Sequence, residues 1–159
     1  MKKIKSHYSE LIELSEAFRN STIKRLKQVP PGKENWRISP GAMSFADITS
    51  HLIDTDEWLF QKIRQKELAP ILGVAGSVTV PDHEQYLKLV ENLIESGKKR
   101  TKFISGLSER DLKELIYDDR FGKEVSVWWI IVRGNFDHEI HHRGAIAAAL
   151  RVLNDSKDN

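Results

Sequence analysis

The chain has 159 residues, of which 40% are hydrophobic and 30% charged, a balance typical of a folded domain and not of a disordered chain. The formal charge of +2 is too small to predict a nucleic-acid-binding surface, which needs a clustered basic face. There is no cysteine, which excludes thiol nucleophiles, disulfides and thiolate metal ligands. Any metal ion must therefore be held by nitrogen and oxygen atoms.

The N-terminus and the apolar runs predict a cytoplasmic protein. The segment from Met1 to His7 is basic, but mixed polar residues follow it in place of the apolar core of a signal peptide. No apolar run approaches the length of about 20 residues that a transmembrane helix needs. We therefore expect no membrane partner.

The first predicted helix runs from about Ile4 to Lys27, where apolar residues recur at spacings of three and four. Two prolines and a glycine, residues 30–32, end it. The loop from Lys33 to Gly41 carries Trp36. We expect this side chain to cover the ends of the helices in preference to stacking on a ligand.

The second predicted helix runs from about Phe45 to Lys66, with Ser44 as its N-cap and Asp47 three residues further on. His51 lies beside the apolar stripe at the middle of this helix. A single histidine on an apolar face is more often a hydrogen-bonded core residue than a ligand. Taken alone, His51 therefore predicts no site.

The third predicted helix spans about His83 to Ile104 and follows Asp82, which we expect to cap it. A run of basic residues, 97–102, lies near its C-terminal end. We interpret this run as a solvated face that complements the helix dipole, and not as an RNA or DNA contact.

The rest of the chain predicts a short helical turn from Ser108, a loop or short ribbon over residues 115–125, and a fourth long helix from Val127 to about Leu153, capped by Ser126. Four long amphipathic helices without a convincing strand pattern predict an all-α protein, a four-helix bundle with long loops between its helices. We expect one domain over residues 1–153 and a polar tail over residues 154–159.

Three of the six histidines lie within five positions of this fourth helix, at His138, His141 and His142. His138 and His142 are four residues apart, so they lie one turn apart on the same helix face. Helical bundles build metal sites from inward side chains on facing helices, which makes His51 a natural third ligand. His141 is three residues from His138 and competes with His142 as its partner on the helix, and the spacing alone does not decide between these two. The alternative is a cluster of surface histidines on a polar face.

Three histidine ligands suit Zn²⁺ or Ni²⁺, with Fe or Mn as alternatives, and leave a coordination position open for water or substrate. Asp137 or Glu139 could orient an imidazole, or both could be solvated or paired with neighbouring helices. The H-E-x-x-H pattern makes Glu139 a candidate general base, although the chain lacks the framework of a peptidase. Arg143 could bind an anionic substrate group or form a buried pair that anchors the helix. The candidate catalytic residues are thus Glu139, His141 and Arg143.

Three stretches resemble the DinB-like family of small bacterial proteins: Trp36 with Pro40-Gly41, the segment Ser44–Leu52, and the segment His138–Gly144. The resemblance implies a four-helix bundle, often a homodimer, with a divalent metal on His51, His138 and His142. This ligand set agrees with the one favoured by helical geometry. Ala145 departs from the family pattern, which often has glutamine there, and this puts a substrate role of that position in doubt.

The resemblance also implies an activity, since relatives include transferases and isomerases that use low-molecular-weight thiols, and metal-dependent hydrolases. We therefore predict a metal-dependent enzyme that activates a thiol or a water for attack on a small-molecule substrate. Thiol transfer is preferred over hydrolysis on the resemblance alone. One alternative is a non-catalytic metal- or ligand-binding stress-response protein, and another is a structural dimer whose histidines have lost their role.

Overall fold

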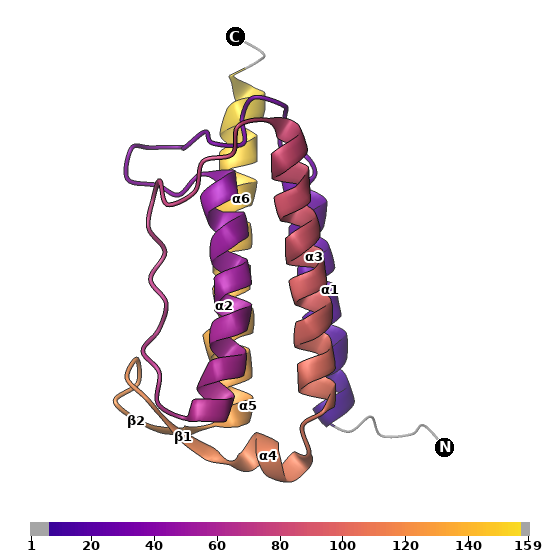
Figure 1. The fold of residues 1–159 in the computed structure, drawn as a ribbon, viewed down its shortest axis with the longest axis vertical. Coiled ribbons are helices and arrows are strands. Elements are labelled where there is room, and N and C mark those ends of the chain that lie inside the picture. Colours follow the sequence, from indigo (N-terminus) through magenta and orange to yellow (C-terminus); the bar gives the residue numbers. More distant parts are fainter. Residues whose placement is uncertain (1–6, 157–159) are drawn as a thin grey trace.

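Four long helices form a bundle in the computed structural model, which describes residues 7–156: α1 His7–Leu26, α2 Phe45–Gln65, α3 His83–Ser105 and α6 Asp137–Asp155. Helices α1 and α6 run in one direction along the bundle, and α2 and α3 run in the other (Figure 1). The predicted all-α fold is therefore confirmed. The expected start of α1 at Ile4 and the end of the expected tail, residues 157–159, lie outside the described residues.

Side-chain caps begin α2 and α3 where the sequence predicts them. The hydroxyl of Ser44 accepts the Asp47 amide at 3.0 Å, and the Asp47 carboxylate accepts the Ser44 amide at 2.8 Å. The carboxylate of Asp82 accepts the Gln85 amide at 2.8 Å. Each cap supplies an acceptor to an amide that has no partner within its helix.

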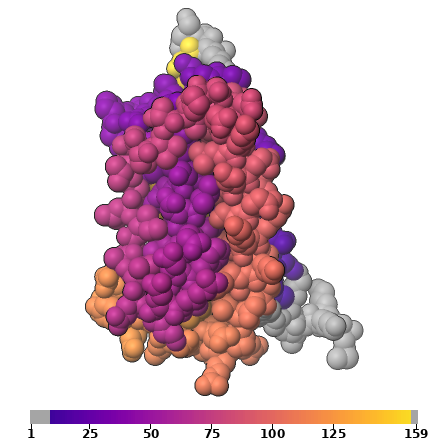
Figure 2. All heavy atoms as spheres, viewed as in Figure 1, coloured from indigo at the N-terminus to yellow at the C-terminus, as the bar shows by residue number. Residues whose placement is uncertain are grey.

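The segment between α2 and α3, residues 66–82, is here called the α2–α3 connection. Because α2 and α3 run in the same direction, this segment has to return along the length of the bundle, and it does so beside α2 (Figure 1). In the space-filling view, α2 and the connection together cover the left part of this face (Figure 2). The carboxylate of Asp47 holds the connection to the start of α2 by accepting the amides of Gly76 and Val78, each at 2.9 Å.

The fourth long helix is interrupted, which the sequence did not predict. It consists of α5 Val127–Trp129, a π-helix η1 Ile130–Phe136, and then α6. Its cap is as predicted, since the Ser126 hydroxyl accepts the Trp129 amide at 3.2 Å. Helix α6 continues to Asp155, two residues past its predicted end. The wider turns of a π-helix change the direction in which every later side chain points, so η1 sets the orientation of α6 side chains.

A short helix and a β-hairpin lie between α3 and α5. Helix α4 spans Glu109–Lys113, and strands β1 Leu115–Asp118 and β2 Lys123–Ser126 pair antiparallel, with Leu115 opposite Ser126. The sequence predicts either a loop or a short ribbon over residues 115–125, and the structure has the ribbon. The hairpin lies near the C-terminal end of α2 (Figure 1).

The apolar core consists of two clusters, one at each end of the bundle. One contains Leu26, Phe45 and Ile146, and the other contains Leu11, Leu59 and Ile131. Along each long helix, buried polar residues lie between the members of the two clusters. No helix in residues 7–156 has both the length and the apolar character needed to cross a bilayer.

Candidate metal centre

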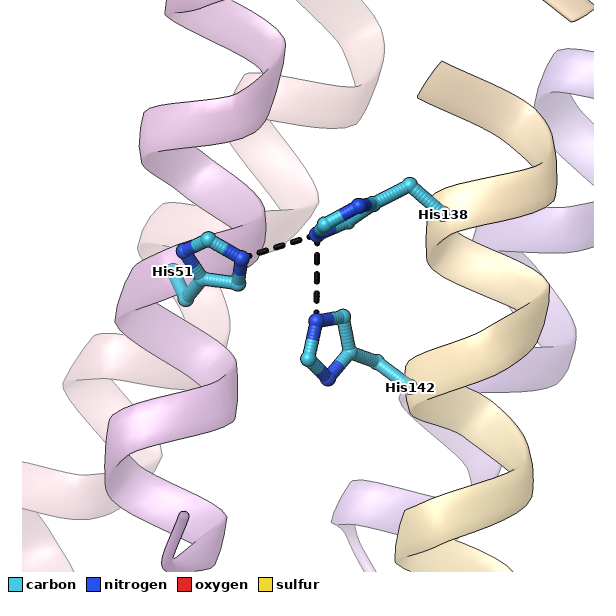
Figure 3. A group of neighbouring side chains, drawn as sticks. All are labelled: His51, His138 and His142. Atoms are coloured by element: carbon cyan, nitrogen blue, oxygen red, sulfur yellow. Dashed lines mark hydrogen bonds between the residues drawn. The ribbon is translucent and has the colours of Figure 1, made fainter. Parts of the chain in front are cut away.

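Three imidazole rings from two facing helices converge inside the bundle (Figure 3). His51 extends from α2, and His138 and His142 extend from successive turns of α6. The Nε2 atom of His138 lies 2.8 Å from Nε2 of His51 and 3.0 Å from Nε2 of His142. One nitrogen from each ring lies within 4.8 Å of the other two, so the three side chains could hold one ion between them.

Without a cation, the three rings cannot satisfy one another by hydrogen bonds alone. A neutral imidazole nitrogen carries either one proton or one lone pair, so Nε2 of His138 cannot make a full hydrogen bond to both neighbours. A divalent cation accepts a lone pair from each ring instead. Zinc–nitrogen bonds of about 2.0–2.1 Å place tetrahedral ligand atoms about 3.3 Å apart, close to the separations found between these rings. The donor set therefore fits a transition-metal ion.

Burial keeps these three histidines uncharged. Burial, together with the neighbouring histidines, lowers the pKa of His138 to about 4 and that of His142 to about 3. Burial also lowers the pKa of His51, against the opposing effect of Asp54. At neutral pH all three rings are in the form that binds metals.

Glu139 follows His138 in sequence and points about 100° away from it around α6, toward α1 and α3. Its side chain is almost fully buried, with Arg19 Nε 2.9 Å from Oε1 and Arg100 Nη1 hydrogen-bonded to Oε2. Burial alone would raise the pKa of Glu139, but the charges of Arg100 and Arg19 outweigh it and lower the pKa to about 2. The Glu139 carboxylate therefore pairs with neighbouring helices; it is not solvated and does not orient an imidazole.

Asp56 and Asn135 extend this pairing into a network that joins all four long helices. Arg19 donates to Asp56 at 2.9 Å, and Asn135 accepts from Arg100 at 3.0 Å and donates to Asp56 at 3.2 Å. Two arginines and two carboxylates thus balance in charge, and the network ties η1 and α6 to the helix that carries His51.

The position of Arg100 corrects the interpretation of the basic run 97–102 as a solvated face. Arg100 is fully buried, with an exposed fraction of 0%. Its spacing from Leu93 and Ile104, both buried, marks the apolar face of α3 and could have identified it. Arg19, on the buried face of α1 between Ser15 and Ile23, carries the same signal.

The remaining sequence candidates lie outside the cluster. His141 is exposed, and its ring contacts that of His142 with centroids 5.2 Å apart. The guanidinium carbon of Arg143 lies 5.7 Å from the ring centre of Phe18. Asp137 pairs with Arg133 at 3.5 Å on the surface. The structure therefore brings His142, and not His141, together with His138 and His51.

Two cavities flank the cluster. One, of about 240 Å³, is lined by His138, Trp58 and Arg120, and by residues 70–72 of the α2–α3 connection. The other, of about 230 Å³, is lined by both His141 and His142 and by apolar side chains that include Trp36. Trp36 also packs on Phe45, with ring centres 6.5 Å apart, near the start of α2. Each cavity offers space for a small molecule next to a clustered histidine.

The α2–α3 connection passes close to the cluster between these cavities. A Cβ atom on Gly73 would lie 2.7 Å from Sδ of Met43 and 3.3 Å from Cδ2 of His51. Glycine therefore allows the backbone to approach His51 this closely. Arg120 and the connection escaped the sequence analysis because nothing local in the sequence indicates that they meet at His138.

The fold and the cluster define a four-helix-bundle protein with three histidines converging in its interior. A family model of the DinB superfamily matches residues 15–146, most of the chain, and the chain therefore belongs to the DinB superfamily. It is similar in fold to the crystal structure of a DinB-like protein from Bacillus subtilis, with a TM-score of 0.67 and 18% sequence identity over 91% of this chain and 92% of that chain. A comparison with curated proteins finds no match.

Proposed function

We propose that this protein is a metal-dependent enzyme that binds a divalent transition-metal ion with His51, His138 and His142. The observation that carries the proposal is the convergence of three uncharged imidazole nitrogens within 4.8 Å of one another. Nitrogen donors of this kind favour Zn²⁺ or Ni²⁺, with Fe or Mn as weaker candidates.

The number of donors supports catalysis over storage of the ion. Within the described residues the cluster consists of three histidines, and a catalytic site typically keeps one position open beside three protein ligands. An ion bound there supplies a Lewis acid that makes a water or a thiol nucleophilic at neutral pH. The chain itself supplies the neutral ligands, the network that fixes their helices, and cavities that accept a substrate.

Between thiol transfer and hydrolysis, the two cavities favour transfer. A transferase has to hold two reactants next to the same reactive centre, whereas a hydrolase needs one substrate and a water. His138 lines one cavity and His142 lines the other, so each cavity reaches a different ligand of the same site. We therefore propose a transferase that uses a low-molecular-weight thiol and a second small molecule.

Among the candidate catalytic side chains, His141 is the best placed to move a proton. It is exposed and lines the second cavity, whereas both oxygens of Glu139 are held by arginines. Arg143 lines neither of the two cavities, and we assign it to packing on Phe18. On the basis of the family resemblance we also propose that the protein is a homodimer and lies in the cytoplasm. Light scattering on the purified protein tests the oligomeric state.

Elemental analysis of untagged protein tests the metal site. We expect about one transition-metal ion per chain, loss of the ion in His51→Ala, and full metal content in His141→Ala, which changes a neighbouring histidine outside the cluster. Metal content that survives in His51→Ala would contradict the assignment of this ligand.

Turnover is tested by pairing low-molecular-weight thiols with electrophiles, and separately with esters and amides. We expect transfer of the thiol to the electrophile. His141→Ala should slow this transfer, and chelation of the metal should abolish it.

A further inference from the structure

We propose that the cavity between His138 and Arg120 binds the carboxylate of a small organic acid, with Arg120 as the residue that determines this specificity. The inference rests on the proposed function in one respect, since His138 is taken to present the metal at the inner end of the cavity. It adds a substrate class and a binding residue to that function.

Besides His138 of α6, four separate parts of the chain form the walls of this cavity. Thr55 and Trp58 belong to α2, Gly134 to η1, and Arg120 to the turn of the hairpin, while Pro70, Ile71 and Leu72 come from the connection. The indole Nε1 of Trp58 donates to the carbonyl of Ala69 at 2.9 Å, which fixes the start of the connection against α2. Most of the wall is apolar, so the body of the ligand can be apolar as well.

Two of the three guanidinium nitrogens of Arg120 are hydrogen-bonded to Asp118, and the third, Nη1, is available to a ligand. Its Nε donates to Oδ1 of Asp118 at 2.9 Å and its Nη2 donates to Oδ2 at 2.5 Å. Its guanidinium carbon lies 4.9 Å from the ring centre of Trp58. Within residues 7–156, Nη1 donates no hydrogen bond to another residue. A guanidinium fixed along one edge is a prepared donor for a ligand oxygen at the other.

Gly134 makes room for this guanidinium. A Cβ atom at position 134 would lie 2.7 Å from Nη2 and 3.2 Å from Nη1 of Arg120, and 3.3 Å from the ring of Trp58. Any side chain here would push the arginine away from η1. The glycine, the indole and Asp118 therefore cooperate to hold Arg120 at the mouth of the cavity.

The charges around the cavity favour an anion. Arg120 is the charged residue among those that line it, and no acidic side chain lines it among the described residues. Asp118, which balances Arg120, is itself close to the buried ammonium of Lys62, and both cations lower the pKa of Asp118 against the effect of its burial. The three groups Arg120, Lys62 and Asp118 together carry one positive charge.

One unpaired guanidinium nitrogen and one excess charge fit a carboxylate better than a phosphate dianion, which needs more donors. The cavity volume of about 240 Å³ limits the ligand to a small molecule. The ligand that fits this cavity is therefore a small acid that places its carboxylate at Arg120 and its reacting atom at His138.

Binding of thiol acids to the Co²⁺-loaded protein tests this assignment without relying on turnover. Mercaptoacetate, 3-mercaptopropionate and 4-mercaptobutyrate are titrated against their primary amides, because sulfur binds Co²⁺ and changes its absorption spectrum. We expect at least one acid to bind about ten- to hundredfold more tightly than its amide, the range expected for a hydrogen bond between charged groups. We expect Arg120→Gln to abolish that preference.

The matched control is Arg133→Gln. It removes one arginine charge next to Gly134 in η1, where the Arg133 side chain pairs with Asp137 on the surface. The preference should survive it. The double variant Arg120→Gln/Asp118→Asn avoids leaving a buried carboxylate unpaired, and it should also lack the preference while melting near the parent protein. Gly134→Ala, which displaces Arg120, should weaken binding of the acid more than binding of its amide.

Equal binding of every acid and its amide, or a preference that survives Arg120→Gln, would overturn the carboxylate assignment. If Co²⁺ does not bind at all, the metal proposal fails by itself. Calorimetric titration of the same acids and amides into the metal-free protein then decides the role of Arg120 separately. There, too, a preference for the acid that Arg120→Gln abolishes supports the assignment, and equal binding rejects it.

Discussion

The side chains of Arg19 and Glu139 meet in the centre of the bundle, with 2.9 Å between Nε and Oε1, although 120 positions separate them in sequence. Because Glu139 directly follows His138, this pair fixes the rotation of α6 about its axis. His138 and His142 then face α2 and His51, while Glu139 faces α1 and α3. The buried pair thus determines the direction of the helix face that carries His138 and His142.

Replacing Glu139 by glutamine should destabilise the protein strongly. The change leaves Arg19 and Arg100 buried with one carboxylate, Asp56, between them, and loss of one partner from a buried ion pair costs about 3–5 kcal/mol. Urea denaturation of the metal-free protein measures the change. The control is Glu95→Gln, which removes an exposed partner of Lys98 and should change the free energy of unfolding by less than about 1 kcal/mol. Equal effects of the two changes would contradict the role given to Glu139.

The metal-free protein should lose stability as the pH falls below about 6.5. The unfolded chain takes up protons on its histidines near pH 6.5, whereas the folded chain resists until the pKa values of about 4 for His138 and about 3 for His142. Between these limits the unfolded state binds more protons, so unfolding becomes easier by about 1.4 kcal/mol per pH unit for each histidine.

Denaturation midpoints in chelator at pH 7 and pH 5 measure this effect. A variant with alanine at positions 51, 138 and 142 should lose most of the dependence in this window. Equal loss of stability by parent and variant between the two pH values would contradict this prediction, because the slope would then come from other groups.

Asp47 should control how firmly the α2–α3 connection covers the site. Asp47→Ala removes the acceptor for the amides of Ser44, Gly76 and Val78, so hydrogen exchange at residues 76–78 should become faster. Asp111→Ala is the control, since it removes a comparable cap from α4 without touching the connection. Unchanged exchange at residues 76–78 in Asp47→Ala would show that other contacts hold the connection.

Local patterns predicted much of the fold and part of the site. The spacing of His138 and His142 predicts a pair on one helix face, and bundle geometry points to His51, because both depend on regular helix periodicity. The caps at Ser44 and Asp82 depend only on residues within one turn. These features need no knowledge of contacts distant in sequence.

Most of the features that the sequence does not predict depend on partners distant in sequence, whereas the burial of Arg100 follows from its place on the apolar stripe of α3. The π-helix η1 has no local signature here, and Asn135 within it bonds to Arg100 and Asp56 on other helices. The charge of Arg100 suggests a solvated face, but its position on the apolar stripe of α3 buries it. The cavity at Arg120 exists only because the hairpin and the connection meet beside α2.

The most direct test of the account is anomalous diffraction at the zinc absorption edge from crystals of the Zn²⁺-loaded protein. We predict one peak per chain between α2 and α6, with the Nε2 atoms of His51, His138 and His142 each about 2.0–2.1 Å from the ion. A peak that includes His141 or a carboxylate in place of one of these ligands would contradict the assignment. The absence of any peak at the cluster would contradict the metal site itself.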